Sequence, residues 1–354
     1  MRKSSRKWIL LLLAVGVLAF AVYRSSGFIH LADFSFGKLV RAVRGANLFL
    51  LGLSIAAIYV CYAVRALRWK GFQSNLGPSR FLPIFQMTLA GFAAVFLLGR
   101  AGEPVRPLLL ARKEKLANSG MFGIYVLERL FDAASTAVVA AIALLLFESH
   151  SHTGETASSL ETAARTTGSV LFAAVLGAIA VLVYLRLHGT AMLERRLQGW
   201  LAARNWKATV ADVVLGFARG VQTIRSWADL ALSVLYSGVH WFVVLLVYLW
   251  VSHAFGGSLA GIGLGDAMLV MAFTLVGSAV QLPGVGGGSQ VASFLAYTTI
   301  FGVEKEPAAA VSIVLWLITF AAVSVPGVPL LIHQGLSLGQ LKEMAEHEKE
   351  ELKA

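Results

Sequence analysis

Long apolar runs recur along most of the chain, and short links that contain Lys and Arg separate them. A helix needs about 20 apolar residues to cross a bilayer, and six runs reach or approach that length. We therefore predict six membrane-spanning helices, at residues 8–23, 48–64, 121–147, 169–187, 230–251 and 308–332. Two further apolar regions, residues 81–98 and 266–301, are broken or flanked by Pro and Gly and do not fit a simple span.

The charges in the links predict the side of the membrane on which each link lies, because cytoplasmic loops carry an excess of Lys and Arg. The link 188–229 is rich in Arg and is placed in the cytoplasm, whereas the acidic link 148–168 is placed outside. Both ends of 81–98 then lie in the cytoplasm, as do Arg65, Arg68 and Arg106, and both ends of 266–301 lie outside. We expect two re-entrant helical hairpins that point toward each other.

The composition is that of an all-α, polytopic membrane helix bundle. Of the 354 residues, 57% are hydrophobic and 14% are charged, and the mean hydropathy is +0.74. No long polar block interrupts the pattern, so we predict one integral membrane domain at residues 1–332 and a charged cytoplasmic tail at 333–354. Membrane orientation and anionic headgroups explain the net charge of +11, which therefore does not indicate nucleic acid. The single cysteine, Cys61, excludes an intrachain disulfide.

Both ends of the chain are expected in the cytoplasm. The first residues also have the basic start, apolar middle and small-residue motif of a cleaved signal peptide, although an uncleaved first helix is the simpler interpretation. Lys38, Arg41 and Arg44 would lie outside, against the positive-inside rule. Apolar residues opposite these cations indicate an amphipathic helix at the membrane interface.

A glycine-rich stretch, LPGVGGGSQ, interrupts the last third of the chain. Non-helical backbone at membrane depth is tolerated only where it is buried in protein or lines a cavity, and a helix that begins there would direct free N–H groups at an anion. No Lys-Ser or Lys-Thr follows, so this is not a nucleotide-binding loop. The alternative is a hairpin tip built for close packing. The candidate headgroup-binding residues are Gly284, Gly286, Gly287, Gly288, Ser289 and Gln290.

A second motif, GRAGEPVRPLLLARKEK, follows the first hairpin region. Arg100, Glu103 and Arg106 recur at intervals of three, near one helical face. Arginine suits bidentate contact with phosphate, and Glu103 could orient an arginine. The alternative is an ion pair at the cytoplasmic edge of the membrane.

The third motif is YVLERLFD, where Glu128 and Asp132 are one helical turn apart and Arg129 can pair with Asp132. Charges this far inside a span are costly and face the bundle interior, so the three residues are functional candidates. A buried structural salt bridge is the alternative. His240 is expected to be a hydrogen-bonded packing residue, and the pair His150 and His152 supports metal binding only weakly.

Together the three motifs resemble the lysylphosphatidylglycerol synthase transmembrane family, and the resemblance covers residues 48–332. It implies an integral protein of a bacterial or archaeal plasma membrane that acts as a lipid translocase or an accessory protein of lipid, hopanoid or glycolipid synthesis. In fused members a soluble aminoacyl-transfer domain makes the lipid and the membrane part moves it between leaflets. Here the chain stops soon after the last span, so synthase activity is not expected. Relatives often carry an acidic residue where this chain has Gln290, which argues against a mechanism that needs a carboxylate there.

These observations favour a flippase-like lipid translocase, or a lipid-binding transport protein, that takes a phosphate-bearing headgroup into a central polar cavity. The expected partners are anionic or aminoacylated phospholipids or polyprenyl lipids. The sequence is also compatible with assembly into a homo-oligomer. No cofactor, metal or catalytic residue is predicted. The alternatives are a membrane enzyme that uses Glu103, Glu128 or Asp132 as acid or base, and a non-catalytic scaffold of a lipid-synthesis complex.

Overall fold

The structure is a computed structural model that describes residues 36–147, 155–188, 191–201, 226–278, 280–282 and 286–334. Apart from turns and short links, its described part is helical except for one pair of two-residue strands. Four stretches are long and apolar enough to cross a membrane: Leu48–Gln73, Phe81–Gly102, Trp227–Ala254 and Lys305–His333. The predicted helical bundle is therefore confirmed.

The count of six spans is not reproduced in the described residues. The predicted span 8–23 and most of the tail 333–354 lie outside them. Runs 121–147 and 169–187 fall in two long helices, α6 (Asn118–Leu145) and α7 (Glu155–His188), which are not among the four. In α6 the charged residues of the third motif interrupt the apolar run.

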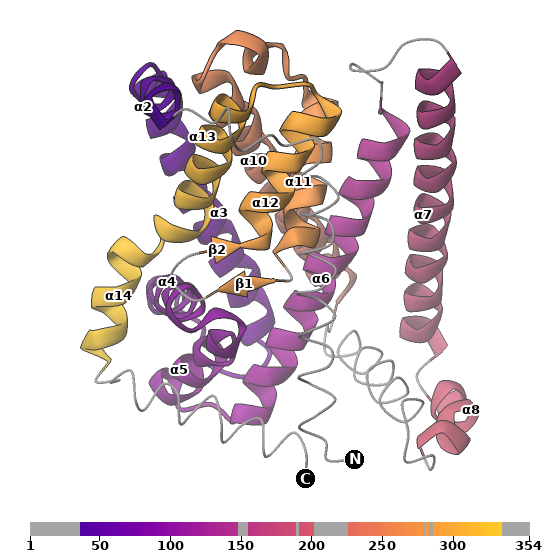
Figure 1. Ribbon diagram of the computed structural model, residues 1–354. Coiled ribbons are helices and arrows are strands. Elements are labelled where there is room, and N and C mark those ends of the chain that lie inside the picture. Colours follow the sequence, from indigo (N-terminus) through magenta and orange to yellow (C-terminus); the bar gives the residue numbers. More distant parts are fainter. Residues whose placement is uncertain are drawn as a thin grey trace, which may run out of the picture.

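Helices α3 (Leu48–Gln73) and α10 (Trp227–Ala254) pack side by side in the centre of the molecule (Figure 1). Polar side chains set their starts. Asn47 accepts hydrogen bonds from the backbone N–H groups of Phe49 and Leu50, and Ser226 accepts one from Asp229. Such caps satisfy N–H groups that have no partner in the first helical turn.

Residues 81–98 were expected to turn back within themselves, and this is wrong: they form one unbroken helix, α4 (Phe81–Leu98). The chain turns after it, at the 3-10 turn η2 (Gly99–Gly102), and returns as α5 (Val105–Glu114). We call α4, η2 and α5 the first hairpin. Gly99 ends α4 with a φ of 64°, a conformation that glycine adopts readily. The two helices then run back along each other so closely that a Cβ at Gly91 would overlap Arg106. An ion pair of 3.5 Å between Arg80 and Glu114 joins the open ends of the hairpin.

The second hairpin consists of α11 (Leu264–Gly277), the strands β1 (Gln281–Leu282) and β2 (Gly286–Gly287), and α12 (Gly288–Leu295). Its strands pair antiparallel, with Gln281 opposite Gly287. A Cβ at Gly277 or Gly288 would overlap the carbonyl of the other, so the two helices meet backbone to backbone. The tips of the hairpins touch, because the Arg100 guanidinium donates to the Ser278 carbonyl at 3.3 Å.

One interrupted helix links the two hairpins. Its upper part, α13 (Lys305–Trp316), packs on α12, and its lower part, α14 (Ser324–His333), packs on α4. Between them lies a π-helical turn, η5 (Leu317–Ala321). The hydroxyls of Tyr59 and Tyr62, both on α3, donate to carbonyls of this region, those of Ala322 (2.8 Å) and Thr319 (3.3 Å).

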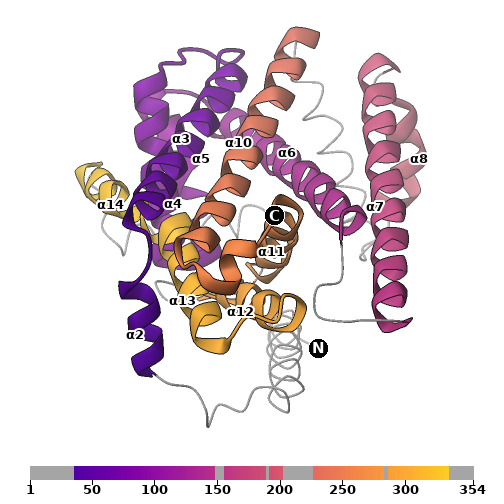
Figure 2. The ribbon, with the colours of Figure 1, turned by 90° about the horizontal axis from the view of Figure 1, so that it is seen from above.

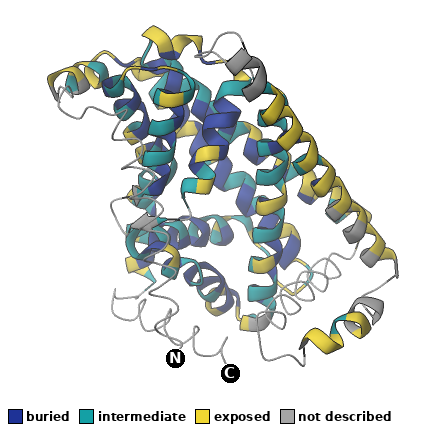
Figure 3. Cartoon of the chain, turned by 45° about the vertical axis from the view of Figure 1, so that its right-hand side comes forward, coloured by how far each residue is buried: buried dark blue, intermediate teal, exposed yellow. Residues whose placement is uncertain are grey.

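Peripheral helices complete the described structure. The amphipathic α2 (Phe36–Arg44) forms as predicted and packs on α13. Helix α7 stands at one side and packs on α6, with α8 (Ala191–Leu201) near its end (Figure 2). Buried residues concentrate in the bundle, whereas much of α7 is exposed (Figure 3).

The contact between α14 and the first hairpin gives a stability test. A Cβ at Gly327 would lie 2.5 Å from the Leu89 carbonyl oxygen and 2.7 Å from the Ala93 Cβ. We expect Gly327→Ala to destabilise the protein by about 1–3 kcal/mol through overpacking. A thiol-reactive dye can follow melting, because Cys61 is the only cysteine and is buried.

The matched control is Gly238→Ala on α10, where a Cβ would meet nothing within 4 Å. That substitution is expected to be neutral or slightly stabilising, since alanine favours helix over glycine. Equal melting of the two variants would contradict the close approach of α14 to α4.

Candidate functional site

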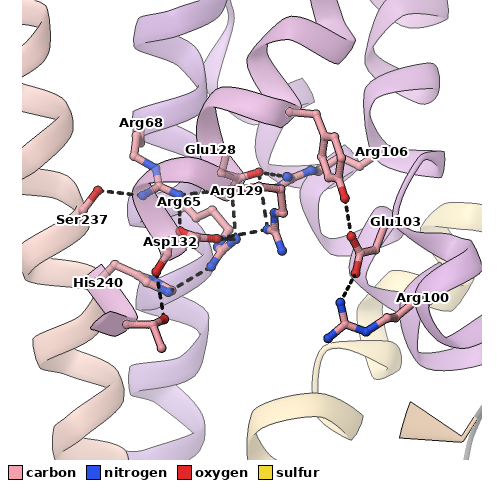
Figure 4. Close-up of polar contacts among 12 residues, drawn as sticks. Arg65, Arg68, Arg100, Glu103, Arg106, Glu128, Arg129, Asp132, Ser237 and His240 are labelled. Atoms are coloured by element: carbon pink, nitrogen blue, oxygen red, sulfur yellow. Dashed lines mark hydrogen bonds and ion pairs between the residues drawn. The ribbon is translucent and has the colours of Figure 1, made fainter. Parts of the chain in front are cut away.

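A cluster of charged and polar side chains lies inside the bundle, where α3, α5, α6 and α10 come together (Figure 4). It contains all three predicted residues of the third motif and one residue, Arg106, of the second. It also includes residues of α3 and α10 that were not assigned to a site from the sequence. We call it the arginine cluster and define it by its members: Arg65, Arg68, Arg106, Glu128, Arg129, Asp132, Ser237 and His240.

Glu128 is the centre of the cluster and is 1% exposed. Its Oε1 accepts from Arg65 at 3.0 Å and from Arg106 at 3.2 Å, and Arg68 lies at 3.4 Å. Arg106 also bonds the second carboxylate oxygen, so the contact is bidentate. Bidentate contact between guanidinium and carboxylate fixes orientation as well as charge.

Asp132 lies one turn further along α6 and ties the same helices together. Its two oxygens pair with Arg65 at 2.9 Å and with Arg68 at 2.7 Å, and Arg129 lies at 3.1 Å. The predicted pair between Arg129 and Asp132 is therefore present. Residues four apart share a helix face, which explains why both carboxylates reach α3.

Helix α10 supplies neutral partners for the arginines of α3. Arg68 donates to the Ser237 hydroxyl at 2.7 Å, and Arg65 contacts Nε2 of His240 at 3.2 Å. A guanidinium can only donate, so Nε2 must accept and the proton of the neutral ring belongs on Nδ1. His240 is thus a hydrogen-bonded residue of the interior, as expected.

Aromatic rings cover the guanidinium groups. The Arg106 guanidinium lies 4.1 Å from the ring centre of Trp69, and the Phe92 ring lies 5.1 Å from Arg65 and 5.3 Å from Arg106. Arg129 lies 5.5 Å from the ring of Tyr125. Such contacts stabilise a cation without neutralising it.

Positive charge is in excess in the arginine cluster. Within the described part of the chain, its ion pairs bring together four arginines and only two carboxylates. Arg65, Arg68 and Arg106 are buried, whereas the Arg129 side chain is 37% exposed and its Nε has no hydrogen-bond partner among the described groups. Uncompensated buried charge is costly, so the arrangement favours an anion near Arg129.

The other two residues of the second motif lie at the hairpin tip. Tyr125 donates a hydrogen bond to Glu103, and Arg100 lies 3.6 Å from Glu103. Arg100 is 58% exposed and also contacts the tip of the second hairpin. Through Tyr125, this pair adjoins Arg129, so the structure places the second and third motifs next to each other.

The glycine segment closes the tip of the second hairpin. Gly284 lies outside the described residues, and Gly286 and Gly287 form β2. The N–H of Gly287 bonds the side chain of Gln290, and the N–H of Gly288 bonds the Val280 carbonyl at 2.8 Å. Two of the N–H groups at the start of α12 thus have protein partners. Contact of this segment, including Ser289, with a phosphate stays a prediction.

The structure corrects the surroundings expected for three arginines. Arg65 and Arg68 were assigned to a link between helices, but α3 continues to Gln73 and both side chains are buried in ion pairs. Arg106, assigned like them to the cytoplasm, is buried against Glu128. The side of the membrane on which the three residues lie stays a prediction. A sequence signal for these ion pairs was present. Arg65 and Arg68 are three residues apart and share one helix face, and Glu128 and Asp132 are four apart and share another.

Metal ligands do not gather in the part of the chain described here. No group of three or more His, Cys, Asp or Glu residues in it could hold a metal ion. His150 and His152 lie outside the described residues.

The membrane-length helices and the buried arginine cluster define a multi-pass membrane protein with a polar centre. The chain belongs to the lysylphosphatidylglycerol synthase transmembrane family, because the family model described as "Lysylphosphatidylglycerol synthase TM region" matches residues 8–327. The resemblance noted from the three motifs is thereby confirmed, and it relates this membrane protein to phospholipid handling. Searches of curated proteins and of solved structures gave no match.

The cluster predicts a strong effect of neutralising Glu128. In Glu128→Gln, the arginines from α3 and α5 lose a shared counter-charge, and breaking a buried pair costs about 3–5 kcal/mol. We expect a large fall in the melting temperature, and a smaller fall in the double variant Glu128→Gln/Arg106→Gln, which removes one of the stranded charges.

Arg112→Ala is the matched control, because Arg112 is on α5 but exposed. It should melt like the wild type. Additive effects of Glu128→Gln and Arg106→Gln in the double variant would contradict a direct interaction between the two side chains.

Proposed function

We propose that this protein is a flippase-like lipid translocase that takes the phosphate of a lipid headgroup at Arg129 and Arg100. Inside the bundle, four arginines are paired with only two carboxylates among the described residues, and a bound phosphate would offset this excess of positive charge. Family membership, which relates the chain to phospholipid handling, supports it.

Arg129 is the residue best suited to contact a ligand. Its side chain is 37% exposed although it pairs with Asp132 at 3.1 Å, and its buried Nε has no partner among the described groups. Arg65, Arg68 and Arg106 are instead almost completely buried in their ion pairs. Arg100 at the hairpin tip is also accessible. A headgroup phosphate between Arg100 and Arg129 would offset the excess charge, while its acyl chains remain in the bilayer.

The carboxylates favour transport over catalysis. A general acid or base must be free to exchange a proton, but Glu128 forms ion pairs with four arginines and Asp132 with three. Glu103 is held by Tyr125 and Arg100. All three carboxylates are thus better suited to balance charge and to hold arginines in place than to react.

The proposal includes two opposed re-entrant hairpins in one membrane domain of a prokaryotic plasma membrane, with both chain ends in the cytoplasm. Three observations support the opposed hairpins. The ion pair between Arg80 and Glu114 joins the ends of the first hairpin, and the tips of the two hairpins touch. Helix α4 is seen nearly end-on in Figure 1, where α6 and α7 are seen from the side. Opposed discontinuous helices around a central site are typical of alternating-access transporters.

Cysteine labelling tests the topology of the first hairpin. In a Cys61→Ala background, we expect Arg80→Cys and Lys115→Cys to react with a membrane-impermeant maleimide from the same side of the membrane. The second test pair, Gly261→Cys and Lys305→Cys, is expected to react from the opposite side. Labelling of Arg80→Cys and Lys115→Cys from opposite sides would show that residues 81–102 cross the membrane.

Lipid movement tests the function. The purified protein in liposomes should speed the transbilayer movement of fluorescent phosphatidylglycerol, and Arg129→Ala should slow it by about 10-fold to 100-fold, because a hydrogen bond to a charged group contributes about 1.5–3 kcal/mol. Arg112→Ala provides the control, since it removes an exposed arginine outside the cluster.

Movement of a neutral lipid at the same rate, or full activity of Arg129→Ala, would overturn the proposed role of the cluster. Absence of movement for phosphatidylglycerol, an aminoacylated phospholipid and a polyprenyl phosphate, with a folded protein, would instead favour the scaffold alternative.

A further inference from the structure

The amphipathic helix α2 carries cations that the proposed transport does not use. Lys38, Arg41 and Arg44 recur at intervals of three, which places them along one side of the helix, and all three are exposed. Arg41 and Arg44 form no ion pair within the part of the chain that the structure describes. Their charges can therefore attract anions from outside the protein.

Helix α2 lies at one end of the bundle. The chain passes from α2 into α3 through Asn47, whose backbone N–H donates at 2.7 Å to the carbonyl of Ala254, the last residue of α10. Helices α3 and α10 are both long and apolar enough to cross a membrane, so one begins and the other ends beside α2. In Figure 1, α2 lies near the upper end of α13. This is the level at which the headgroups of a bilayer would lie.

Apolar side chains next to the cations are exposed as well. Val43 is 44% exposed at the end of α2, and Leu48 and Phe49, at the start of α3, are 77% and 76% exposed. An amphipathic helix with this combination lies in the membrane interface, where its apolar side chains contact acyl chains and its cations contact anionic headgroups. The two kinds of side chain on and beside α2 thus match the two parts of an anionic lipid.

We infer that Lys38, Arg41 and Arg44 form a binding surface for anionic phospholipids of the surrounding leaflet. Each Lys or Arg near the surface attracts an anionic headgroup, whereas a zwitterionic headgroup has no net charge to attract. The orientation expected from the other links would place these cations outside, against the positive-inside rule, and lipid binding gives them a role there. Because α2 packs on α13, and α13 packs on α12, lipids bound at this surface would lie next to the support of the second hairpin.

The inference goes beyond the proposed lipid transport and does not depend on it. The surface is exposed and lies on α2, whereas the arginine cluster is formed by α3, α5, α6 and α10. Contact between α2 and lipids can be measured without any lipid movement, so failure of one proposal leaves the other intact.

Local quenching of a fluorophore tests the binding surface. The full-length protein, with Val43→Cys in a Cys61→Ala background, is labelled with a fluorescent maleimide and placed in phosphatidylcholine nanodiscs. The discs contain a small, equal fraction of phosphatidylglycerol or phosphatidylcholine with the same nitroxide on an acyl chain. We expect nitroxide phosphatidylglycerol to quench about twofold more strongly at low salt, because the cations enrich anionic lipid around α2. In 1 M NaCl, where the Debye length is about 3 Å, the two lipids should quench equally.

The charge variant of the labelled protein is Lys38→Gln/Arg41→Gln/Arg44→Gln. It should be quenched equally by the two lipids even at low salt, because it keeps the apolar side chains of α2 and loses the cations. An undiminished preference for phosphatidylglycerol in this variant would overturn the inference.

Arg112→Gln/Lys113→Gln/Lys115→Gln is the matched control, because it removes three exposed cations from the end of α5. It should keep the preference at α2. Equal quenching by the two lipids at low salt, in the labelled protein with all its cations, would also overturn the inference. That comparison needs no charge variant, so a misfolded variant leaves the test decisive.

Discussion

One carboxylate, Glu128 on α6, pairs with arginines from two other helices, and this contact determines how the centre of the bundle is assembled. A charged side chain inside an apolar bundle destabilises the protein unless it is paired. Helices α3 and α5 must therefore lie where Arg65 and Arg106 can both contact Glu128 on α6. Gly91 permits this, because its missing side chain lets Arg106 approach α4 closely. The position of the first hairpin therefore follows from the charge on α6.

The same pairing connects the polar centre with the interrupted helix. Helix α3 carries Arg65 toward Glu128 and Asp132, and one turn earlier it carries Tyr62, whose hydroxyl bonds the Thr319 carbonyl in the π-helical turn. A shift of α3 in response to a ligand at the arginine cluster would therefore reach the region between α13 and α14. Those two segments pack on different hairpins, so this helix is the element best placed to move one hairpin relative to the other.

Much of the architecture could be predicted from the sequence, because apolar runs and their interruption by Pro and Gly can be recognised within a short stretch of the chain. The runs that became α3, α4, α10 and the interrupted helix were recognised, as was the amphipathic α2. Glu128, Arg129 and Asp132 stood out because charges are costly within an apolar span. The number of membrane spans was predicted less well. Helix α6 was counted as a span, but its charged residues shorten its apolar stretch.

What the sequence did not predict depends on contacts between distant parts of the chain. Arg65 and Arg68 follow an apolar run, where basic residues usually mark a membrane boundary, and their carboxylate partners come some sixty residues later. The glycines suggested close approach, but only the structure identifies the neighbour of Gly288 as the backbone of Gly277. The π-helical turn has no local pattern in the sequence and was missed.

We propose that the excess positive charge of the arginine cluster binds the phosphate of a lipid. The decisive experiment is native mass spectrometry of the purified protein, with phosphatidylglycerol and a diacylglycerol of the same acyl chains offered in equal amounts. We expect the protein to retain phosphatidylglycerol in preference to diacylglycerol, and we expect Arg129→Ala to lose this preference while Arg112→Ala keeps it. Equal retention of both lipids by the wild type, or an undiminished preference in Arg129→Ala, would show that the cluster does not bind the phosphate.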